Sequence, residues 1–397
     1  MRTLATPNSA PVITTLFPRV MRGMAACVLF AICAGILALA MSNGNAANRD
    51  FVSYWAAGQR LVHHADPYNS SAIFQLEKSA GWTDDRALLM RNPPFALLLT
   101  IPLGFVSEKT GAVLWSLLIL ATLMASVRFL RDIHENPPNR LHLLGYLFAP
   151  SLACMLAGQT SAFALLGLTL FLRFHRTRPL IAGAALVLCA LKPHLFLPFA
   201  VVLISWMILQ KAYRPFAGAA LALTISCAVP LLFDPSVYAN YAAMARTSGI
   251  EGEFVPTLGE VLRIAIHPQA VWLQFLPAVV GCIWAAWYFR QHRNHWEWRT
   301  HGSNLMLLSL LVAPYSWFTD EVVLLPAMFQ AIYAADVSPR SRSLLWFVAI
   351  DGLALIEVLA GVQLDSPLYV WTPAAWMVWY LCFMRDSRSS AMLPAEV

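Results

Sequence analysis

Long apolar segments recur along the whole chain and restrict its folding more than any other feature. Each covers about 17 to 25 residues, which is enough for a helix to cross about 30 Å of hydrocarbon. Hydrophobic residues fill 59% of the 397 positions and charged residues only 12%. Soluble domains carry about 25% charged residues. Inside a bilayer only helices and closed barrels satisfy their own backbone hydrogen bonds. The sequence therefore predicts an all-α polytopic membrane protein.

We expect about 12 transmembrane helices, and the charge distribution gives their direction. The predicted spans lie near 20–41, 110–130, 141–157, 160–174, 179–191, 194–210, 215–232, 270–289, 303–315, 319–335, 343–361 and 368–384. Of the 27 Lys and Arg residues, 18 fall on one side, whereas 13 of the 21 Asp and Glu residues fall on the other. Connections rich in Lys and Arg stay in the cytoplasm, so both termini are predicted to be cytoplasmic.

The chain reads as a single integral membrane domain, 1–397, with a cytoplasmic tail at 1–19 and two long outer loops at 42–109 and 233–269. The first loop contains an apolar, proline-broken stretch, 93–103, that is too short to span. We therefore expect interfacial or re-entrant helices in this loop. The first span also has features of a cleavable signal peptide, and we interpret it as a retained anchor.

Several binding chemistries are disfavoured by composition. All seven cysteines lie inside apolar runs, whereas disulfide frameworks and zinc sites need cysteines that are paired or closely spaced. The formal net charge of +6 comes from residues at helix ends, so it does not indicate nucleic-acid binding. No glycine-rich nucleotide loop and no Asp-x-Asp pair is found.

Unusual polar residues gather at the outer ends of the predicted helices. Asp50 follows the first span, and Phe51, Tyr54 and Trp55 are spaced to form an aromatic face in the headgroup layer. A carboxylate held there could act as a general base or cap the helix. Asp66 begins the sequence Asp-Pro-Tyr, which is typical of a turn and favours a role in ordering the loop.

Two further outer positions have alternative interpretations. Lys192 and His194 flank a proline at an outer hairpin, where the lysine could bind a lipid phosphate or simply extend toward water. Asp320 and Glu321 begin a helix, so they could cap it or contribute to an acceptor site.

An ordered set of short motifs resembles glycosyltransferase family 87, whose members have the GT-C membrane architecture. The motifs that carry the resemblance are Asp50-Phe51-x-x-Tyr54-Trp55-x-x-Gly58, Asp66-Pro67-Tyr68, Asn92-Pro93-Pro94-Phe95, Gly158-Gln159 and Leu191-Lys192-Pro193. They cover about residues 20 to 200, whereas the C-terminal half agrees mainly in its topology.

The resemblance implies a mannosyltransferase, or another hexosyltransferase, that uses a polyprenyl-phosphate sugar donor and a lipid or glycan acceptor. The reaction would occur on the periplasmic side of a bacterial cytoplasmic membrane, invert the anomeric centre and require no cofactor or metal. Asp50 would be the catalytic base, and Lys192, His194 and Arg49 would bind the donor phosphate. The implied substrate-binding residues are Tyr54, Trp55, Asp66, Asn92, Gln159, Trp317 and Asp320. Acceptor choice is expected in the second outer loop, which contains Arg246, Glu251, Glu253 and Arg263.

Two other classes of protein remain open on the sequence. A transporter or flippase for lipid-linked sugars would favour ionisable groups near the bilayer centre and an internal repeat. Asp351 offers the first feature, but no repeat is visible. An acyltransferase or a polysaccharide polymerase or ligase would need a reactive His or paired Arg residues in a large outer loop. The pair His63-His64 is the nearest candidate.

Overall fold

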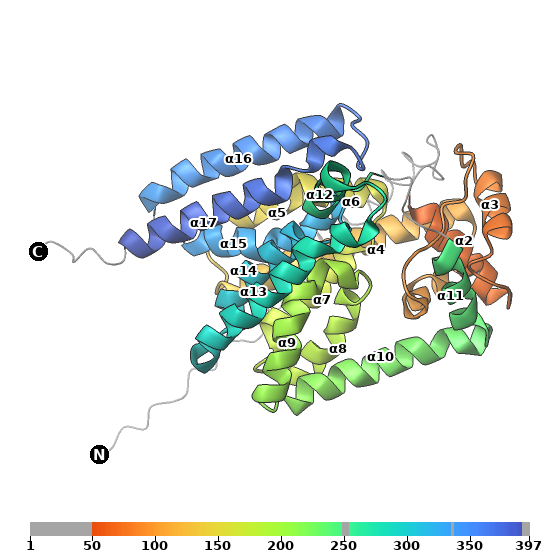
Figure 1. Cartoon of the computed structure of the whole chain (residues 1–397), viewed down its shortest axis with the longest axis horizontal. Coiled ribbons are helices and arrows are strands. Elements are labelled where there is room, and N and C mark those ends of the chain that lie inside the picture. The colour runs from red at the N-terminus through yellow and green to blue at the C-terminus, as the bar shows by residue number, and fades with distance from the viewer. Residues whose placement is uncertain (1–49, 248–253, 335–336, 391–397) are drawn as a thin grey trace, which may run out of the picture.

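The structure is a computed structural model that describes residues 50–247, 254–334 and 337–390 (Figure 1). The N-terminal part is helical, with α2 (Phe51–Val62), α3 (Ser70–Ser79), η1 (Pro94–Leu99), η2 (Ile101–Phe105), α4 (Glu108–Ile133), η3 (Leu141–Leu143), α5 (Leu144–Leu147), α6 (Ala149–Ala157), α7 (Ser161–Phe174), α8 (Pro179–Cys189), η4 (Pro193–Phe196) and α9 (Leu197–Leu209). The remainder comprises α10 (Tyr213–Phe233), α11 (Val237–Thr247), α12 (Leu258–Ile266), η5 (Val271–Phe275), α13 (Leu276–His292), η6 (Arg293–His295), α14 (Trp298–Leu311), η7 (Phe318–Leu324), α15 (Leu325–Ala334), α16 (Val337–Leu359), η8 (Pro367–Tyr369) and α17 (Thr372–Ser390).

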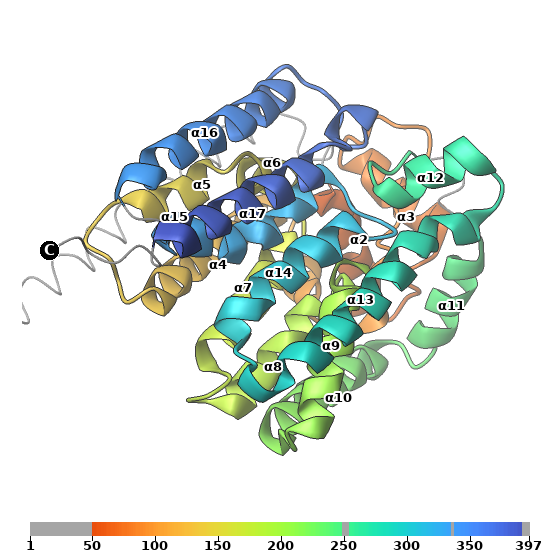
Figure 2. The ribbon, with the colours of Figure 1, turned by 60° about the vertical axis from the view of Figure 1, so that its left-hand side comes forward.

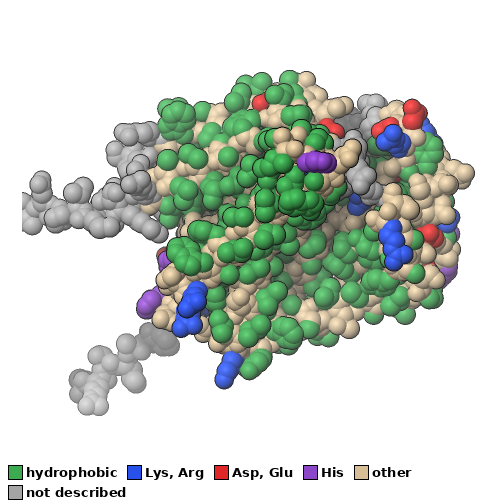
Figure 3. Space-filling view, viewed as in Figure 1, with side chains coloured by type: hydrophobic (Ala, Val, Ile, Leu, Met, Phe, Trp, Pro, Cys, Tyr) green, Lys and Arg blue, Asp and Glu red, His purple; other side chains and the backbone are tan. Residues whose placement is uncertain are grey.

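Three helices of the described chain are long and apolar enough to cross a membrane: Glu108–Ile133, Tyr213–Phe233 and Val271–His295. Shorter apolar helices lie at Ser161–Phe174, Pro179–Cys189 and Pro193–Leu209. Figure 3 shows hydrophobic side chains over the middle of one face, with the visible charged side chains toward its margins. These features identify a helical membrane protein.

Small residues allow α10 to pack tightly on α8 although most of α10 faces outward. A Cβ on Gly183 would lie 1.9 Å from the Pro215 carbonyl oxygen, and one on Gly218 would lie 2.1 Å from that of Leu180. The two backbones are therefore in direct contact. Only 17% of the most apolar stretch of α10 is buried. Figure 1 shows α10 running from the α8–α9 end of the molecule to α11, beside α2.

One predicted span is broken in the structure. The segment expected as a helix over 141–157 contains η3, α5 and α6, and Phe148 between the last two has an extended ψ of 118°. Pro150 supports a new start here because a proline fits the first turn of a helix. The Ala149 N–H donates to Asp351 Oδ1 of α16 over 2.8 Å. The predicted tail 1–19 and first span 20–41 lie outside the described residues.

The expected aromatic surface of α2 is wrong, because its aromatic side chains are buried in protein. Phe51, Tyr54 and Trp55 are at most 6% exposed. Beneath them, a Cβ on Gly58 would lie 2.3 Å from the Thr100 carbonyl oxygen, so α2 packs closely on η1 and η2. The apolar stretch 93–103 accordingly forms two short 3-10 helices that pack on α2 and α10. The buried side chains of this segment belong to the main hydrophobic core.

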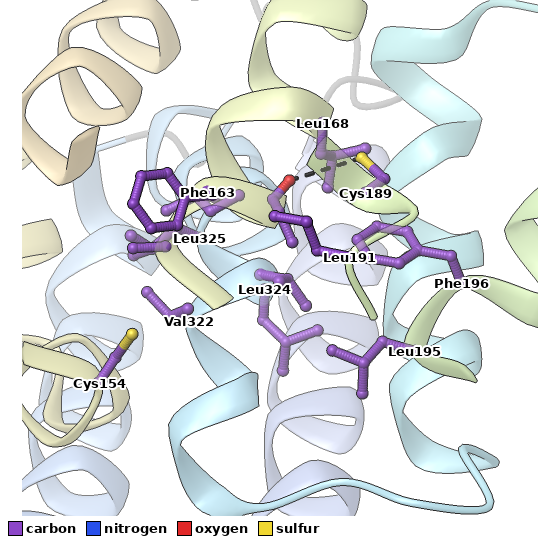
Figure 4. Close-up of a cluster of buried hydrophobic side chains, with 14 of the residues drawn as sticks. Cys154, Phe163, Leu168, Cys189, Leu191, Leu195, Phe196, Val322, Leu324 and Leu325 are labelled. Carbon is purple, nitrogen blue, oxygen red and sulfur yellow. Dashed lines mark hydrogen bonds between the residues drawn. The ribbon is translucent and has the colours of Figure 1, made fainter. Parts of the chain in front are cut away.

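The main core joins α7, α8, η4 and η7, as the close-up in Figure 4 shows. Phe163, Leu168, Leu195 and Leu324 all belong to this core, and each is at most 4% exposed. Of the five cysteines in the described chain, all are free, and the Cys189 thiol donates to the Ala164 carbonyl oxygen over 3.5 Å. α16 and α17 run side by side at the edge of the bundle in both ribbon views (Figures 1 and 2).

Connections that the sequence assigns to the cytoplasmic side meet one another. Arg173 at the end of α7 pairs with Asp132 at the end of α4. Arg176 pairs with Glu297 before α14, and His175 Nε2 lies 3.6 Å from the same carboxylate. The ends of three helices are therefore linked by charge on one side of the bundle.

Candidate active site

A sharp turn after α6 brings the start of α2 into the centre of the molecule. Gly158 ends α6 with φ of 73°, a left-handed conformation that glycine adopts readily. Its carbonyl accepts a 2.7 Å hydrogen bond from the Trp115 indole. The Asp50 N–H donates to the Ala157 carbonyl over 3.1 Å. The turn therefore places Asp50 beside Gln159, the residue that follows the glycine.

The Asp50 carboxylate does not cap its own helix. Asp50 occupies the N-cap position of α2, but its side chain accepts no capping hydrogen bond. It instead accepts one from Gln159 Nε2. The other end of that amide, Oε1, accepts a 2.8 Å hydrogen bond from Lys192 Nζ. Gln159 thus bridges a carboxylate and an ammonium group.

Lys192 is buried and paired rather than extended toward water. Its Nζ lies 2.6 Å from Asp320 Oδ1, and the side chains of Lys192 and Asp320 are 7% and 0% exposed. The Ser161 hydroxyl also donates to Asp320. The second carboxylate oxygen of Asp320 accepts the Trp317 N–H over 3.0 Å at the start of η7. Asp320 therefore both caps η7 and neutralises Lys192.

Asp50, Gln159, Lys192, Asp320 and Ser161 form one polar cluster. The Lys192 ammonium contacts the Asp320 carboxylate directly and is linked to the Asp50 carboxylate through Gln159. Burial raises the pKa of Asp50 from 3.8 to about 6, although the positive charge of Lys192 and the hydrogen bond from Gln159 oppose the rise. The negative charge of Asp320 adds to it. A carboxylate with a pKa near neutrality is suited to accept a proton. Asp320, in contrast, is held directly by Lys192, Ser161 and the Trp317 N–H.

Two aromatic residues border the cluster. The Tyr54 hydroxyl lies 3.5 Å from Gln159 Oε1. The Trp317 ring centre lies 5.9 Å from Lys192 Nζ, within the range of a cation–π contact. Cys154, Leu191 and Val322, which Figure 4 draws, are buried residues of the apolar core. The Cys154 thiol donates to the Gln159 carbonyl oxygen over 3.5 Å, so this core adjoins the cluster.

His194 and Asn92 lie near Lys192 without joining its hydrogen bonds. The Asn92 side-chain amide donates to the Leu191 carbonyl over 2.9 Å, which fixes the backbone just before the lysine. The His194 ring is 5.9 Å from that of Tyr315, and its buried Nε2 has no hydrogen-bond partner among the described residues.

Two other predicted residues have local partners, and one lies outside the structure. The Trp55 indole donates to the Val106 carbonyl over 3.0 Å and so holds the first outer loop together. Asp66 Oδ1 accepts the Tyr68 N–H over 2.9 Å, in agreement with the turn interpretation. Arg49 is not among the described residues.

Sequence reasoning missed Ser161 and the partners of Glu321. Nothing in the sequence around Ser161 distinguishes it from other small helix residues. Glu321 is 2% exposed and accepts hydrogen bonds from the Thr372 hydroxyl and, over 3.1 Å, from the Trp376 indole. It therefore anchors η7, and with it Asp320, to α17. Within the described parts of the chain, no three His, Cys, Asp or Glu side chains converge as a metal site would require.

The fold is that of a helical membrane protein in which a half-buried carboxylate is linked through one amide to a buried lysine. Residues 91–314 match the profile of Glycosyltransferase family 87, which covers more than half of the chain. The chain belongs to this family of membrane glycosyltransferases. The match includes Gln159 and Lys192, whereas Asp50 and Asp320 lie outside its limits. No curated protein and no solved structure matches the chain.

Proposed function

We propose that this glycosyltransferase transfers a hexose, mannose in our assignment, from a polyprenyl-phosphate donor to a lipid or glycan acceptor. The observation that supports the proposal best is the Asp50–Gln159–Lys192 bridge, because it places a base and a cation on opposite ends of one amide. Such a transfer needs a group that takes a proton from the acceptor and a group that stabilises the departing phosphate.

Asp50 serves as the general base in this proposal. Its carboxylate takes the proton of the acceptor hydroxyl while the hydroxyl oxygen forms a bond to the anomeric carbon of the sugar. The bond between that carbon and the phosphate oxygen breaks, and the bonding electrons leave with the polyprenyl phosphate. Attack from the side opposite the phosphate inverts the anomeric configuration.

Lys192 stabilises the negative charge of the departing phosphate. An ammonium group has three N–H donors, and the contacts to Gln159 and Asp320 use two of them. The third donates to the phosphate, and the buried Nε2 of His194 and the guanidinium of Arg49 assist it. Tyr54, Gln159, Trp317 and Asp320 line the substrate site, whereas Trp55, Asp66 and Asn92 fix the loops that shape it.

We further propose the orientation of the protein in the membrane. About twelve spans would cross the cytoplasmic membrane of a bacterium, with both termini in the cytoplasm and the site on the periplasmic side. The distribution of Lys and Arg supports this orientation, as does the meeting of Arg173 with Asp132. A reporter fused after residue 42 should be periplasmic, and a cytosolic reporter would overturn the orientation.

Purified protein tests the activity directly when it is incubated with radiolabelled polyprenyl-phosphate sugars and candidate lipid acceptors. Wild-type protein should transfer radiolabelled mannose from the polyprenyl-phosphate donor to an acceptor. The Asp50→Asn variant should remain folded but show no transfer. Asp85→Asn is the matched control because it changes an exposed acid of the same loop. Wild-type activity in Asp50→Asn would refute the role of the base. Failure of wild-type protein with every polyprenyl-phosphate sugar would refute the donor class.

A further inference from the structure

The second outer loop contains a helix, α12, that turns its charged residues toward the protein and its apolar residues outward. A surface helix of a soluble protein has the opposite arrangement. The apolar side chains of α12 point outward and are 40 to 62% exposed: Leu258, Val261, Ile264 and Ile266. Its two charged residues, Glu260 and Arg263, point inward and are nearly buried. Soluble helices bury the apolar side and expose the charges. The outward side of α12 therefore suits an apolar environment.

The inward charges are fully occupied by neighbouring groups. Arg263 donates two hydrogen bonds to the Glu260 carboxylate, over 2.5 and 3.1 Å, and a third to the Pro268 carbonyl over 2.7 Å. All of these partners lie within the same loop. The pair thus ties the loop together, which disagrees with a direct role for Arg263 in acceptor choice.

α12 rests on the outer end of a membrane-spanning segment. A Cβ on Gly259 would lie 2.2 Å from the Gln274 carbonyl oxygen, so α12 and η5 are in backbone contact. η5 begins the apolar segment Val271–His295, and Trp272 at its start is 67% exposed. Tryptophan is enriched where a span meets the headgroups. Figure 3 shows the hydrophobic surface over α12 continuing over α13, so one lipid-facing surface includes both.

We propose that α12 lies in the outer leaflet of the membrane, with its outward side against the acyl chains just below the headgroups. The partner is the lipid bilayer itself, and the evidence is the reversed polarity of α12 together with its continuity with a span. An amphipathic helix in the plane of the membrane behaves in this way.

The embedded helix is joined to the candidate active site through a short segment. The Gln274 side chain donates to the Pro314 carbonyl over 2.7 Å, and the Phe275 ring lies 5.5 Å from that of Tyr315. Tyr315 in turn contacts His194. If the proposed function holds, on which this step rests, α12 sets the height of the site relative to lipid-borne substrates.

Photolabelling of the wild-type protein tests the location of α12 without any assay of transfer. The protein is placed in phosphatidylcholine–phosphatidylglycerol vesicles with a phospholipid that carries a diazirine on its acyl chain. Parallel samples receive a water-soluble diazirine, and labelled sites are located by mass spectrometry. The lipid reagent should label Leu258, Val261 and Ile264, and the water-soluble reagent should not. Labelling by the water-soluble reagent alone would overturn the proposal. Protection of α12 from both reagents would mean that protein covers this side, and it would also overturn the proposal.

A variant pair relates the location to function. Ile264→Glu should reduce lipid labelling of α12 and lower kcat/KM about fivefold for a long-chain donor, since a charge near the interface is costly in lipid. A short-chain donor that dissolves in water should be unaffected, and Ile264→Val should behave as wild type. Equal losses with both donors would contradict the role in positioning. If no donor is used at all, the proposed function fails and the labelling result still decides where α12 lies.

Discussion

Two buried ion pairs of the described chain differ in how their groups are connected. Glu260 and Arg263 are three residues apart, and their hydrogen bonds stay within one loop. Lys192 and Asp320 are 128 residues apart, and the lysine also reaches Gln159 and, through it, Asp50. All hydrogen bonds of the Glu260–Arg263 pair are thus made within its own loop, and we call this the closed pair. The Lys192–Asp320 pair instead connects segments that are distant in the sequence, and through Gln159 it reaches Asp50, whose pKa is raised. Burial of charge is therefore common to both pairs, and the long-range contacts to Gln159 and Asp50 are what distinguish the candidate active site.

The largest effect expected from this comparison is on stability, and it should be similar for both pairs. Lys192→Met and Arg263→Met each leave a buried carboxylate without its partner, which costs about 3–5 kcal/mol. Neutralising the remaining partner, by Asp320→Asn or Glu260→Gln, should recover most of that loss. Thermal unfolding in a fixed detergent measures both steps. A single variant that unfolds at the wild-type temperature would show that its pair is not buried in the folded protein.

The double variants should differ sharply in activity. Lys192→Met with Asp320→Asn removes the proposed phosphate partner and should lower kcat/KM about 100-fold or more, the scale seen when one electrostatic stabiliser is lost. Glu260→Gln with Arg263→Met changes the closed pair only and should stay within about threefold of wild type. Initial rates with a radiolabelled donor provide the measurement. Equal losses in the two double variants would remove the distinction between the pairs.

The smallest expected effect is on the pH dependence of transfer. The base must be ionised, and the pKa of Asp50 is raised to about 6. Activity should therefore fall about tenfold per pH unit below pH 6 and be level above it. Gln159 lowers this pKa by its hydrogen bond, so Gln159→Leu should move the acidic limb to higher pH. The measurement is kcat/KM as a function of pH for the wild type and the variant. An acidic limb that stays at the wild-type pH or moves to lower pH would contradict the role of Gln159.

Much of the helical layout could be predicted because apolar length is a local property. The predicted spans 110–130 and 215–232 correspond to α4 and α10, each within a few residues. The break at Phe148 could not be predicted from length, because it depends on Asp351 of a distant helix accepting the Ala149 N–H. The burial of the α2 aromatics was missed for a similar reason. Helical spacing shows which residues share a face, but it does not show whether lipid or protein covers that face.

The candidate site was predictable as a set of residues but not as an arrangement. The sequence predicts site residues wherever a polar side chain stands at a predicted outer helix end, as is the case for Asp50, Gln159, Lys192 and Asp320. Their connection through the Gln159 amide depends on packing between α2, α6, α8 and η7, which no local pattern encodes. Ser161 has no signal in the sequence, because a serine within an apolar helix is common. The Glu260–Arg263 pair, in contrast, follows from the spacing of opposite charges on one helix.

The exposed course of α10 has a consequence for the lipids in which the protein works. A helix of 21 residues is about 31 Å long, close to the hydrocarbon depth of an average bilayer. Because α10 is packed on α8 along one side and exposed along the rest, a thinner bilayer should favour tilting of α8 and α10 together. The last residue of α10, Phe233, has its carbonyl oxygen 2.8 Å from His64 Nδ1, two residues after the end of α2. A tilt of α10 would pull on this contact at the end of α2, so we expect the rate of transfer to vary with membrane thickness.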